Sequence, residues 1–275
     1  MAHKNITQLG KREAEFLALM SSKNAGAFAF VESVGFWKSQ ELAKKKLHLL
    51  EKKGWLARIE RGKYLVIPLE AGPARQWSQD EYIVAQSLVQ PAAVSYWTAI
   101  HHWGWTEQIP RVVYIQTTKR KKSRKKDVFG VTYEFVTVPK RKFFGHSKEW
   151  RDGKQILITD KEKTLVDCAD DVERAGGIQE LVKAVKAASK EISWALLNEY
   201  ADRFRNGAVK KRLGFLFETI VPHLSQEAES VMESWRNSLS AGIAPLYPSL
   251  GKKGKISTRW GIIDNVGLKR LPHQK

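Results

Sequence analysis

The side chains of this sequence that could do chemistry are mostly cationic, and they are densest between residues 119 and 126. The sequence there, KRKKSRKK, has seven basic residues in eight positions. Such a run can bind nucleic-acid phosphates or an acidic partner, and it is equally typical of a solvated loop held open by its own repulsion. Because it separates two β-branched segments, we expect an exposed hairpin loop. The candidate phosphate or partner contacts are Lys119, Arg120, Lys121, Lys122, Arg124, Lys125 and Lys126.

The second cationic segment is WKSQELAKKKLHLLEKKG, from residue 37 to residue 54. Its apolar residues recur with helical spacing, which predicts a helix with Ser39 as its N-cap and Gly54 as its stop. The positions expected to face inward are Leu42, Ala43, Leu47 and Leu50. The lysines fall on the faces that this core does not use. Two short strands are expected next, over 55–59 and 63–67, with a turn at 60–62, and Pro68 ends the unit.

Two shorter helices are expected before the lysine-rich one. The first covers residues 7–20 with Thr7 as its N-cap, and the second covers 28–34 with Gly35 as its breaker. Three helices followed by a two-stranded ribbon are the order of a winged helix-turn-helix. In that motif the third helix meets base edges in the major groove and the wing meets the backbone. The predicted DNA contacts are Lys38, Ser39, Gln40, Lys44, Lys45, Arg61 and Lys63. The alternative is an ordinary solvated helix face in a fold that mediates protein contacts.

The rest of the chain predicts a second, larger domain. The turn-rich segment 70–80 marks the junction, and helices are expected over 80–89, where Ser78 is the N-cap, and over 92–103. Strands are expected over 111–118, 128–138 and 155–159, helices return from Asp160 onward, and a closing strand is expected after Lys255. The predicted class is therefore α+β: a winged helix-turn-helix over 1–70, followed by a mixed α+β domain over 71–275.

Motifs of an enzyme are absent from the sequence. It contains no phosphate-binding loop, no dinucleotide fingerprint, no GxSxG and no HExxH. His101 and His102 are adjacent, so on a helix they point in different directions, and their tryptophan neighbours favour packing. An acidic cluster could suggest Mg²⁺ in a nuclease: Asp160, Glu162, Asp167, Asp170 and Asp171. Its first two members suit a helix N-terminus, and we expect at most one of its carboxylates to face inward. No catalytic residue, cofactor or metal is predicted, and a metal-dependent nucleic-acid-processing enzyme is the less favoured alternative.

The composition favours a polyanionic partner. The formal net charge is +18 with an isoelectric point near 9.9, and the excess is spread along the whole chain. Double-stranded DNA is the expected partner, although a basic protein kept soluble by repulsion has the same composition. No apolar run approaches the ~18 residues of a membrane span, and no signal peptide is evident, so the expected location is the cytoplasm. The single cysteine, Cys168, excludes an internal disulfide and is expected to be a small buried side chain.

The order of these features resembles the AbiEi family, the antitoxins of abortive-infection, type IV toxin–antitoxin systems. The segments that carry the resemblance are 52–66 (KKGWLARIERGKYLV), 95–110 (SYWTAIHHWGWTEQIP), 143–145 (FFG), 158–168 (ITDKEKTLVDC), Gly176 with Gly177, 212–218 (RLGFLFE) and 259–265 (RWGIIDN). The resemblance covers nearly the whole chain. Two features depart from what we expect of the family: the 119–126 run is unusually dense in charge, and the helix after Ser39 is richly basic.

The resemblance implies a function for each part of the chain. The winged helix would repress the protein's own operon by binding repeats in its promoter. The C-terminal domain would oppose a cognate nucleotidyltransferase-like toxin, without forming a stable complex with it. A stand-alone winged-helix transcriptional regulator and an RNA-binding regulator are the alternatives to this antitoxin and autorepressor.

Overall fold

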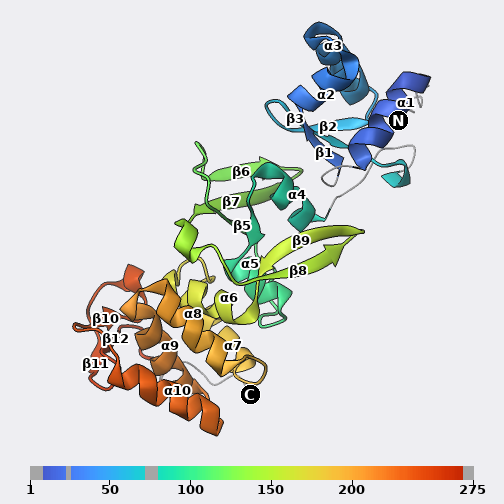
Figure 1. The fold of residues 1–275 in the computed structure, drawn as a ribbon. Coiled ribbons are helices and arrows are strands. Elements are labelled where there is room, and N and C mark those ends of the chain that lie inside the picture. Colours follow the sequence, from blue (N-terminus) through green and yellow to red (C-terminus); the bar gives the residue numbers. More distant parts are fainter. Residues whose placement is uncertain (1–8, 23–25, 72–79, 269–275) are drawn as a thin grey trace. The chain divides into compact units, whose positions relative to one another are not determined.

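The computed structural model describes residues 9–22, 26–71 and 80–268, which form two compact units. Unit 1 comprises residues 1–91 together with two hairpin ends, 127–131 and 150–156, and unit 2 comprises residues 92–126, 132–149 and 157–275. Both units contain helices and strands, so the predicted α+β class is confirmed (Figure 1). The turn-rich junction predicted over 70–80 lies largely outside the described residues. No described helix is both long enough and apolar enough to cross a bilayer.

Unit 1 begins with three helices and a small sheet. The elements are α1 (Lys11–Ser21), β1 (Ala27–Ala29), α2 (Phe30–Trp37), α3 (Gln40–Lys52), β2 (Leu56–Glu60) and β3 (Lys63–Val66). The strands form an antiparallel sheet in the order β1-β3-β2. The strand β1 was not expected, because three residues are too short for a periodic signal. Gly35 was expected to end the second helix, but α2 continues to Trp37 and ends where Lys38 takes a left-handed φ of 60°.

Aromatic side chains hold these three helices on the sheet. The Phe16 ring of α1 lies edge-on to the Phe28 ring of β1, with centroids 5.4 Å apart, and contacts the Trp37 ring at 5.5 Å. Leu47 and Leu50 of α3 complete this core, and both are fully buried. The predicted N-cap Thr7 lies outside the described residues. Unit 1 also includes the short η2 (Leu69–Ala71) and α4 (Glu81–Leu88), which begins after Asp80, whose carboxylate caps it. The predicted N-cap Ser78 lies outside the described residues.

A six-stranded mixed sheet forms the centre of the remaining chain. Its order is β6-β7-β5-β4-β9-β8. The strands are β4 (Ala93–Val94), β5 (Val112–Thr117), β6 (Lys125–Val128), β7 (Val131–Thr137), β8 (His146–Arg151) and β9 (Lys154–Thr159). A helix was expected over 92–103, but only its second part is helical, because residues 93–94 pair with both β5 and β9. The edge strand β8 was also missed, since its sequence HSKEWR lacks the apolar alternation of a half-buried strand.

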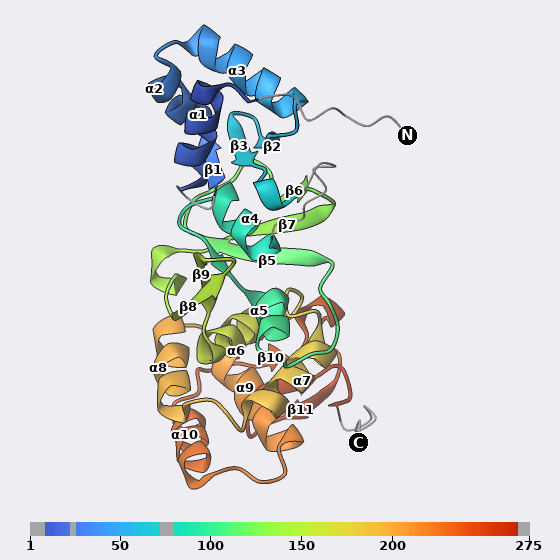
Figure 2. The same ribbon diagram turned by 90° about the vertical axis from the view of Figure 1, so that its right-hand side faces the viewer.

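Helices pack together in the C-terminal part of unit 2 (Figure 2). They are α5 (Tyr96–His102), α6 (Lys161–Asp170), α7 (Ile178–Ala188), α8 (Trp194–Phe204), α9 (Gly207–Ile220) and α10 (Gln226–Asn237), with 3-10 turns η3 (Lys140–Lys142) and η4 (Pro248–Leu250). The predicted closing strand is part of a small sheet, β10-β12-β11, formed by β10 (Ala244–Pro245), β11 (Lys255–Ser257) and β12 (Ile262–Asp264). Cys168 is fully buried in this helical core, as expected.

Segments that carry the family resemblance pack against one another in unit 2. A Cβ on Gly214 of α9 would lie 2.1 Å from the ring of Trp260, so only glycine allows this contact. A Cβ on Gly176 would likewise lie 2.6 Å from the ring of Trp97. These motif residues therefore serve the packing of the unit and expose little for a partner.

Candidate nucleic-acid interface

The turn between α2 and α3 exposes the first residues of α3. Lys38 supplies a left-handed turn, and the Ser39 hydroxyl accepts a hydrogen bond from the Leu42 amide at 3.2 Å, so Ser39 is the N-cap predicted from the sequence. Lys38, Ser39 and Gln40 are all exposed. The Ser39 oxygen is thus already engaged with the helix, while the Gln40 amide is on the surface.

The lysines of α3 and its C-cap, Lys53, differ in their partners. Lys46 and Lys53 donate to the carboxylate of Glu13 on α1, with N–O distances of 2.9 and 3.1 Å. Lys44 and Lys45 are exposed and form no ion pair within the described part of the chain. The inward positions Ala43, Leu47 and Leu50 are buried as predicted. Leu42 is 38% exposed, so its predicted inward position was wrong. It lies in the first turn, where α3 projects beyond the core.

Glu13 is a buried acid that connects α1 to α3. Its burial raises the pKa, but hydrogen bonds from Lys46, Lys53 and the Gly10 amide outweigh the burial, so the net pKa of Glu13 is lowered. The carboxylate therefore stays charged and keeps two lysines on the α1 side of α3. The lysines left for an external anion are on the remaining faces.

The β2–β3 hairpin presents its two predicted contacts differently. Arg61, in the turn, is exposed. The Lys63 ammonium donates to the carbonyl of Leu88 at 2.9 Å and lies 3.6 Å from the Glu60 carboxylate. Both partners belong to unit 1. Lys63 would have to exchange them to reach a phosphate, so Arg61 is the stronger candidate of the two.

The basic run 119–126 is not the hairpin loop that was expected. Strands β5 and β7 are parallel neighbours, and β6 lies beyond β7, so the connection from β5 must pass the end of β7. Only 118–124 form this connection, because Lys125 and Lys126 already belong to β6. The sequence alone could not predict this connection, because the order of strands in a sheet depends on pairing between distant residues.

The side chains of this run are mostly exposed, as expected. The exposed ones are Lys119, Arg120, Lys122, Arg124 and Lys125. Lys121 lies over the Phe135 ring at 4.8 Å, and Lys125 lies 3.5 Å from the Glu134 carboxylate. Lys119, Arg120 and Lys122 form no ion pair within the described residues.

The structure adds cations to this run that sequence reasoning did not single out. Thr117 and Thr137 are the last register pair of β5 and β7, so the connection 118–124 and the turn 139–142 leave the sheet at the same edge. The Arg141 guanidinium in that turn donates to the carbonyl of Phe204, at the end of α8, at 2.8 Å. We call five exposed cations of the connection 118–124, the turn 139–142 and the end of α8 the basic edge: Lys119, Arg120, Lys122, Lys140 and Arg205. Arg124, Arg141 and Arg203 are also exposed in these segments, but Arg141 donates to Phe204 and Arg203 lies over the Phe144 ring. The only sequence signal for the added ones is the short run KRK at 140–142.

The acidic cluster is dispersed among structural partners. Asp160 caps α6 and accepts from the Tyr200 hydroxyl at 2.9 Å, and Glu162 accepts from the Ser193 amide at 2.7 Å. Asp170 accepts from Lys142 at 2.7 Å, and Asp171 pairs with Arg174. Among the described residues, no three His, Cys, Asp or Glu side chains are grouped so that they could hold a metal ion.

One expectation about this cluster was wrong, because two of its carboxylates face inward. Glu162 is 7% exposed and Asp167 is 1% exposed. Asp167 pairs with Lys163, one turn earlier on α6, and that lysine is fully buried as well. Burial raises the pKa of Asp167 to about 6, despite the neighbouring ammonium, and burial lowers the pKa of Lys163. The two histidines predicted to pack, His101 and His102, lie half-buried on α5, with the His102 ring 4.7 Å from that of Trp103.

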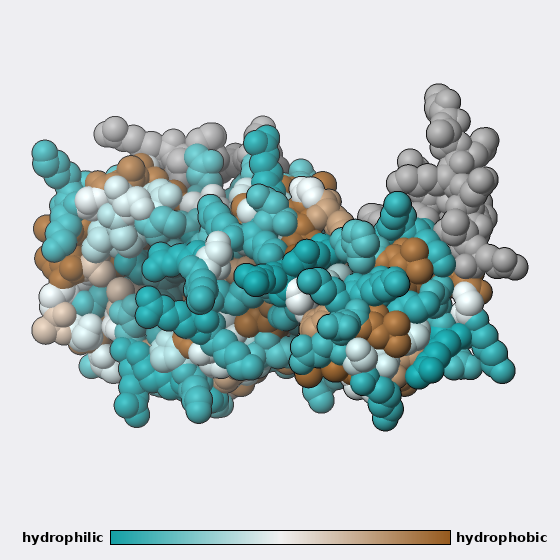
Figure 3. Space-filling view, turned by 90° about the horizontal axis from the view of Figure 1, so that it is seen from above, coloured by the Kyte–Doolittle hydropathy of each residue, from teal (hydrophilic) through white to brown (hydrophobic). Residues whose placement is uncertain are grey.

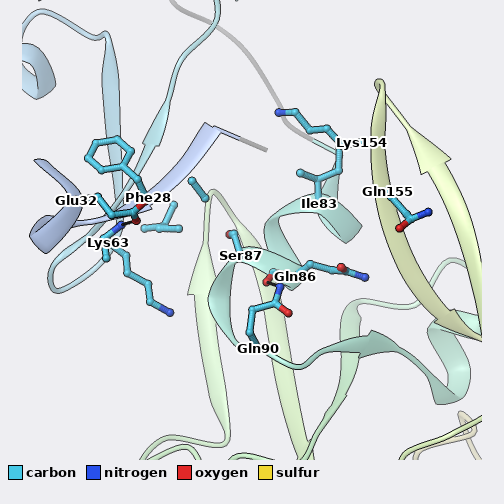
Figure 4. A pocket seen from close by; sticks show the side chains of 12 residues that line it. Phe28, Glu32, Lys63, Ile83, Gln86, Ser87, Gln90, Lys154 and Gln155 are labelled. Atoms are coloured by element: carbon cyan, nitrogen blue, oxygen red, sulfur yellow. Dashed lines mark hydrogen bonds between the residues drawn. The ribbon is translucent and has the colours of Figure 1, made fainter. Parts of the chain in front are cut away.

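A hollow of about 460 Å³ lies in unit 1 (Figure 4). Its polar lining comes from Glu32 and Lys63, from Gln86 and Gln90 of α4 and its end, and from Lys154 of β9. Among the described residues that line this hollow, Lys63 is the one that was predicted from the sequence as a site residue. The described lining residues include no histidine or cysteine and a single carboxylate, so they offer no acid–base pair and no metal-ligand set.

The chain matches no protein-family model and no curated protein. The crystal structure of the RV2827C protein from Mycobacterium tuberculosis is similar in fold, with a TM-score of 0.60 and 12% sequence identity. The similarity covers 93% of this chain and 92% of that one. At this identity the similarity concerns the fold alone, over nearly the full length of both chains.

Proposed function

We propose that this protein is a DNA-binding transcriptional regulator and that the first part of unit 1 is a winged helix-turn-helix. The observation that carries the proposal is the α2–α3 turn. Two residues, left-handed Lys38 and the N-cap Ser39, separate the helices, and they leave the first turn of α3 exposed. A helix that projects its N-terminal turn in this way can enter the major groove of duplex DNA.

The exposed residues of α3 have the chemistry that this docking requires. The Gln40 amide can donate one hydrogen bond and accept another at the edge of adenine. Lys44 follows one turn later on the same face, and Lys45 lies beside it, so both can meet guanine or phosphate oxygens. Arg61 is exposed in the β2–β3 turn, which supports its role as a contact to a backbone phosphate.

The resemblance to the AbiEi family extends the proposal. On that basis the regulated promoter is that of the protein's own operon, and the chain is an antitoxin that opposes a nucleotidyltransferase-like toxin without a stable complex. Support comes from the contacts between resemblance motifs, Gly214 with Trp260 and Gly176 with Trp97, because they give these motifs a shared structural reason to occur together.

The test is binding of the full-length chain to the region upstream of its own gene and to a shuffled duplex of equal length. Gln40→Ala should weaken the free energy of binding to the promoter by about 1–3 kcal/mol, because it removes a base contact. It should change binding to the shuffled duplex little. Lys45→Gln should lower the affinity for both duplexes, and it should reduce the slope of log affinity against log salt by about 0.9. Lys190→Gln, an exposed lysine of unit 2, is the control. If the chain binds both duplexes equally and Gln40→Ala changes neither, α3 is not a reader of sequence.

The antitoxin part has its own readout. If a nucleotidyltransferase-like gene lies beside this one, cells that carry it should survive when the full chain is expressed from an unrelated promoter. The Gln40→Ala variant should rescue them equally well while it fails to repress the native promoter. If the Gln40→Ala variant loses both rescue and repression, repression alone accounts for the protection against the toxin.

A further inference from the structure

We propose that the basic edge of unit 2 is a second nucleic-acid site, which binds the phosphodiester backbone independently of α3. The site is assembled from three separate segments of sequence: the connection 118–124, the turn 139–142 and the end of α8. It goes beyond the proposed function, because it needs neither base readout nor the winged helix.

The first support is geometric. The parallel pairing of β5 and β7 brings the first two segments to one sheet edge, where the Val138 amide donates to the Thr117 carbonyl at 2.9 Å. The Arg141–Phe204 hydrogen bond then attaches the end of α8 to the same edge. Arg205 follows Phe204 directly in a left-handed conformation, with a φ of 54°, and its side chain is exposed. Cations that are distant in sequence therefore share one surface.

The second support comes from the ion pairing of these cations. Lys119, Arg120, Lys122, Lys140 and Arg205 form no ion pair within the part of the chain that the structure describes. Many other cations of unit 2 are paired: Lys142 with Asp170, Lys161 with Glu191, Lys183 with Glu180 and Lys210 with Asp202. Unpaired like charges repel one another, so holding them on one edge raises the free energy of the unbound protein, and a polyanion relieves that repulsion.

The third support separates nucleic acid from an acidic protein. Protein interfaces have an apolar centre in which aromatic residues are enriched. None of the large hydrophobic side chains exposed among the described residues lies in 118–124, 139–142 or 203–205. Figure 3 draws one face of the molecule, and hydrophilic residues predominate on it. A charged edge without an apolar centre suits phosphates, whose binding is mainly electrostatic.

The experiment uses the full-length chain in which Lys44, Lys45 and Arg61 are glutamine, so that binding through unit 1 is weakened. Three further variants each remove two exposed charges: Lys119→Gln with Arg120→Gln, Lys140→Gln with Arg205→Gln, and the control Lys252→Gln with Lys253→Gln. Binding of a 20-base-pair duplex and of a hairpin RNA, both of arbitrary sequence, is measured at several salt concentrations. Thermal unfolding confirms that each variant is folded, and Lys122→Gln with Arg124→Gln replaces the first variant if it is not.

We expect the first two variants each to lower the slope of log affinity against log salt by up to about 1.8 on the duplex, since each lost phosphate contact contributes about 0.9. The control should leave the slope unchanged. A change with both probes supports recognition of the backbone alone, and a change with one probe identifies that nucleic acid as the ligand.

Three results would overturn the proposal. The first is a slope that neither edge variant changes. The second is a reduced slope in the Lys119→Gln with Arg120→Gln variant alone, because the site would then consist of one loop and would not combine three segments. The third is displacement of the nucleic acid by polyglutamate at equal charge concentration, which would show that the edge binds carboxylates as well as phosphates.

Discussion

Helix α3 of unit 1 and helix α6 of unit 2 both pair lysines with carboxylates, but the two pairs differ in their exposure. On α3, the side chain of Lys46 is 31% exposed and pairs with a carboxylate on another helix. On α6, the side chain of Lys163 is fully buried and pairs with Asp167 one turn away. A partly exposed pair can exchange its partner for water or a ligand at small cost, whereas a buried pair cannot. The difference separates charges that can bind something from charges that only specify a packing arrangement.

The environment of Lys163 explains why its pair is structural. Its ammonium lies 5.2 Å from the ring centroid of Phe144 and 5.1 Å from that of Phe204. The second carboxylate oxygen of Asp167 is buried without a hydrogen-bond partner among the described residues. Burial without full hydrogen bonding is costly, so this pair contributes specificity and little net stability.

The largest expected effect is that of breaking the α6 pair. Lys163→Met leaves the Asp167 carboxylate buried without its counter-ion, and it should lower the free energy of unfolding by about 3–5 kcal/mol. Chemical denaturation followed by circular dichroism measures the change. The double variant Lys163→Met with Asp167→Leu should recover most of the loss, because it removes both buried charges. A double variant as unstable as the single one would mean that the ion pair itself stabilises the fold.

Removing the acid that connects α1 to α3 should cost less. Glu13→Gln should lower the stability of unit 1 by about 1–2 kcal/mol, because Lys46 and Lys53 are partly exposed and can be rehydrated. The lowered pKa of Glu13 means that its contribution is present above its unfolded pKa and is lost as the pH falls through its folded pKa. Hydrogen exchange of peptides from α1 and α3, compared with peptides from α7, measures the effect. Equal loss of protection in all three helices would contradict the local role assigned to Glu13.

A further expected effect is a pH dependence with the opposite sign in unit 2. The pKa of Asp167 is raised from 3.8 to about 6, so between these values the folded state binds more protons than the unfolded state. The free energy of unfolding should therefore fall as the pH rises through this window. Asp167→Asn should reduce that slope, while Glu13→Gln should leave it in place. Part of the slope should remain, because burial also raises the pKa of Asp160. If Asp167→Asn leaves the slope unchanged, Asp167 is not the titrating group.

The comparison also separates features that the sequence could predict from those that it could not. Periodicity and capping predicted α3, with Ser39 as its N-cap and Leu47 and Leu50 in the core. Each of these depends on residues within four positions of one another. The sequence did not reveal β1 or β4, because each of these short strands forms only through pairing with distant residues. It did not reveal β8 because the sequence HSKEWR lacks the apolar alternation of a half-buried strand. Nor did it show that Glu13 takes two lysines of α3 away from an external ligand.

The sequence by itself determined the charge of this protein, the α+β class, the helix α3 and the exposure of most of the run 119–126. These properties follow from composition and from local steric and solvation preferences. Only the tertiary structure decided which charges are free. In the tertiary structure, Lys163 is buried with Asp167, and Lys63 donates to the Leu88 carbonyl. Lys140 and Arg205 lie at the same edge as Lys119. The physical reason is that a charge acquires its role from its exposure and its neighbours, and both depend on residues far away in the chain.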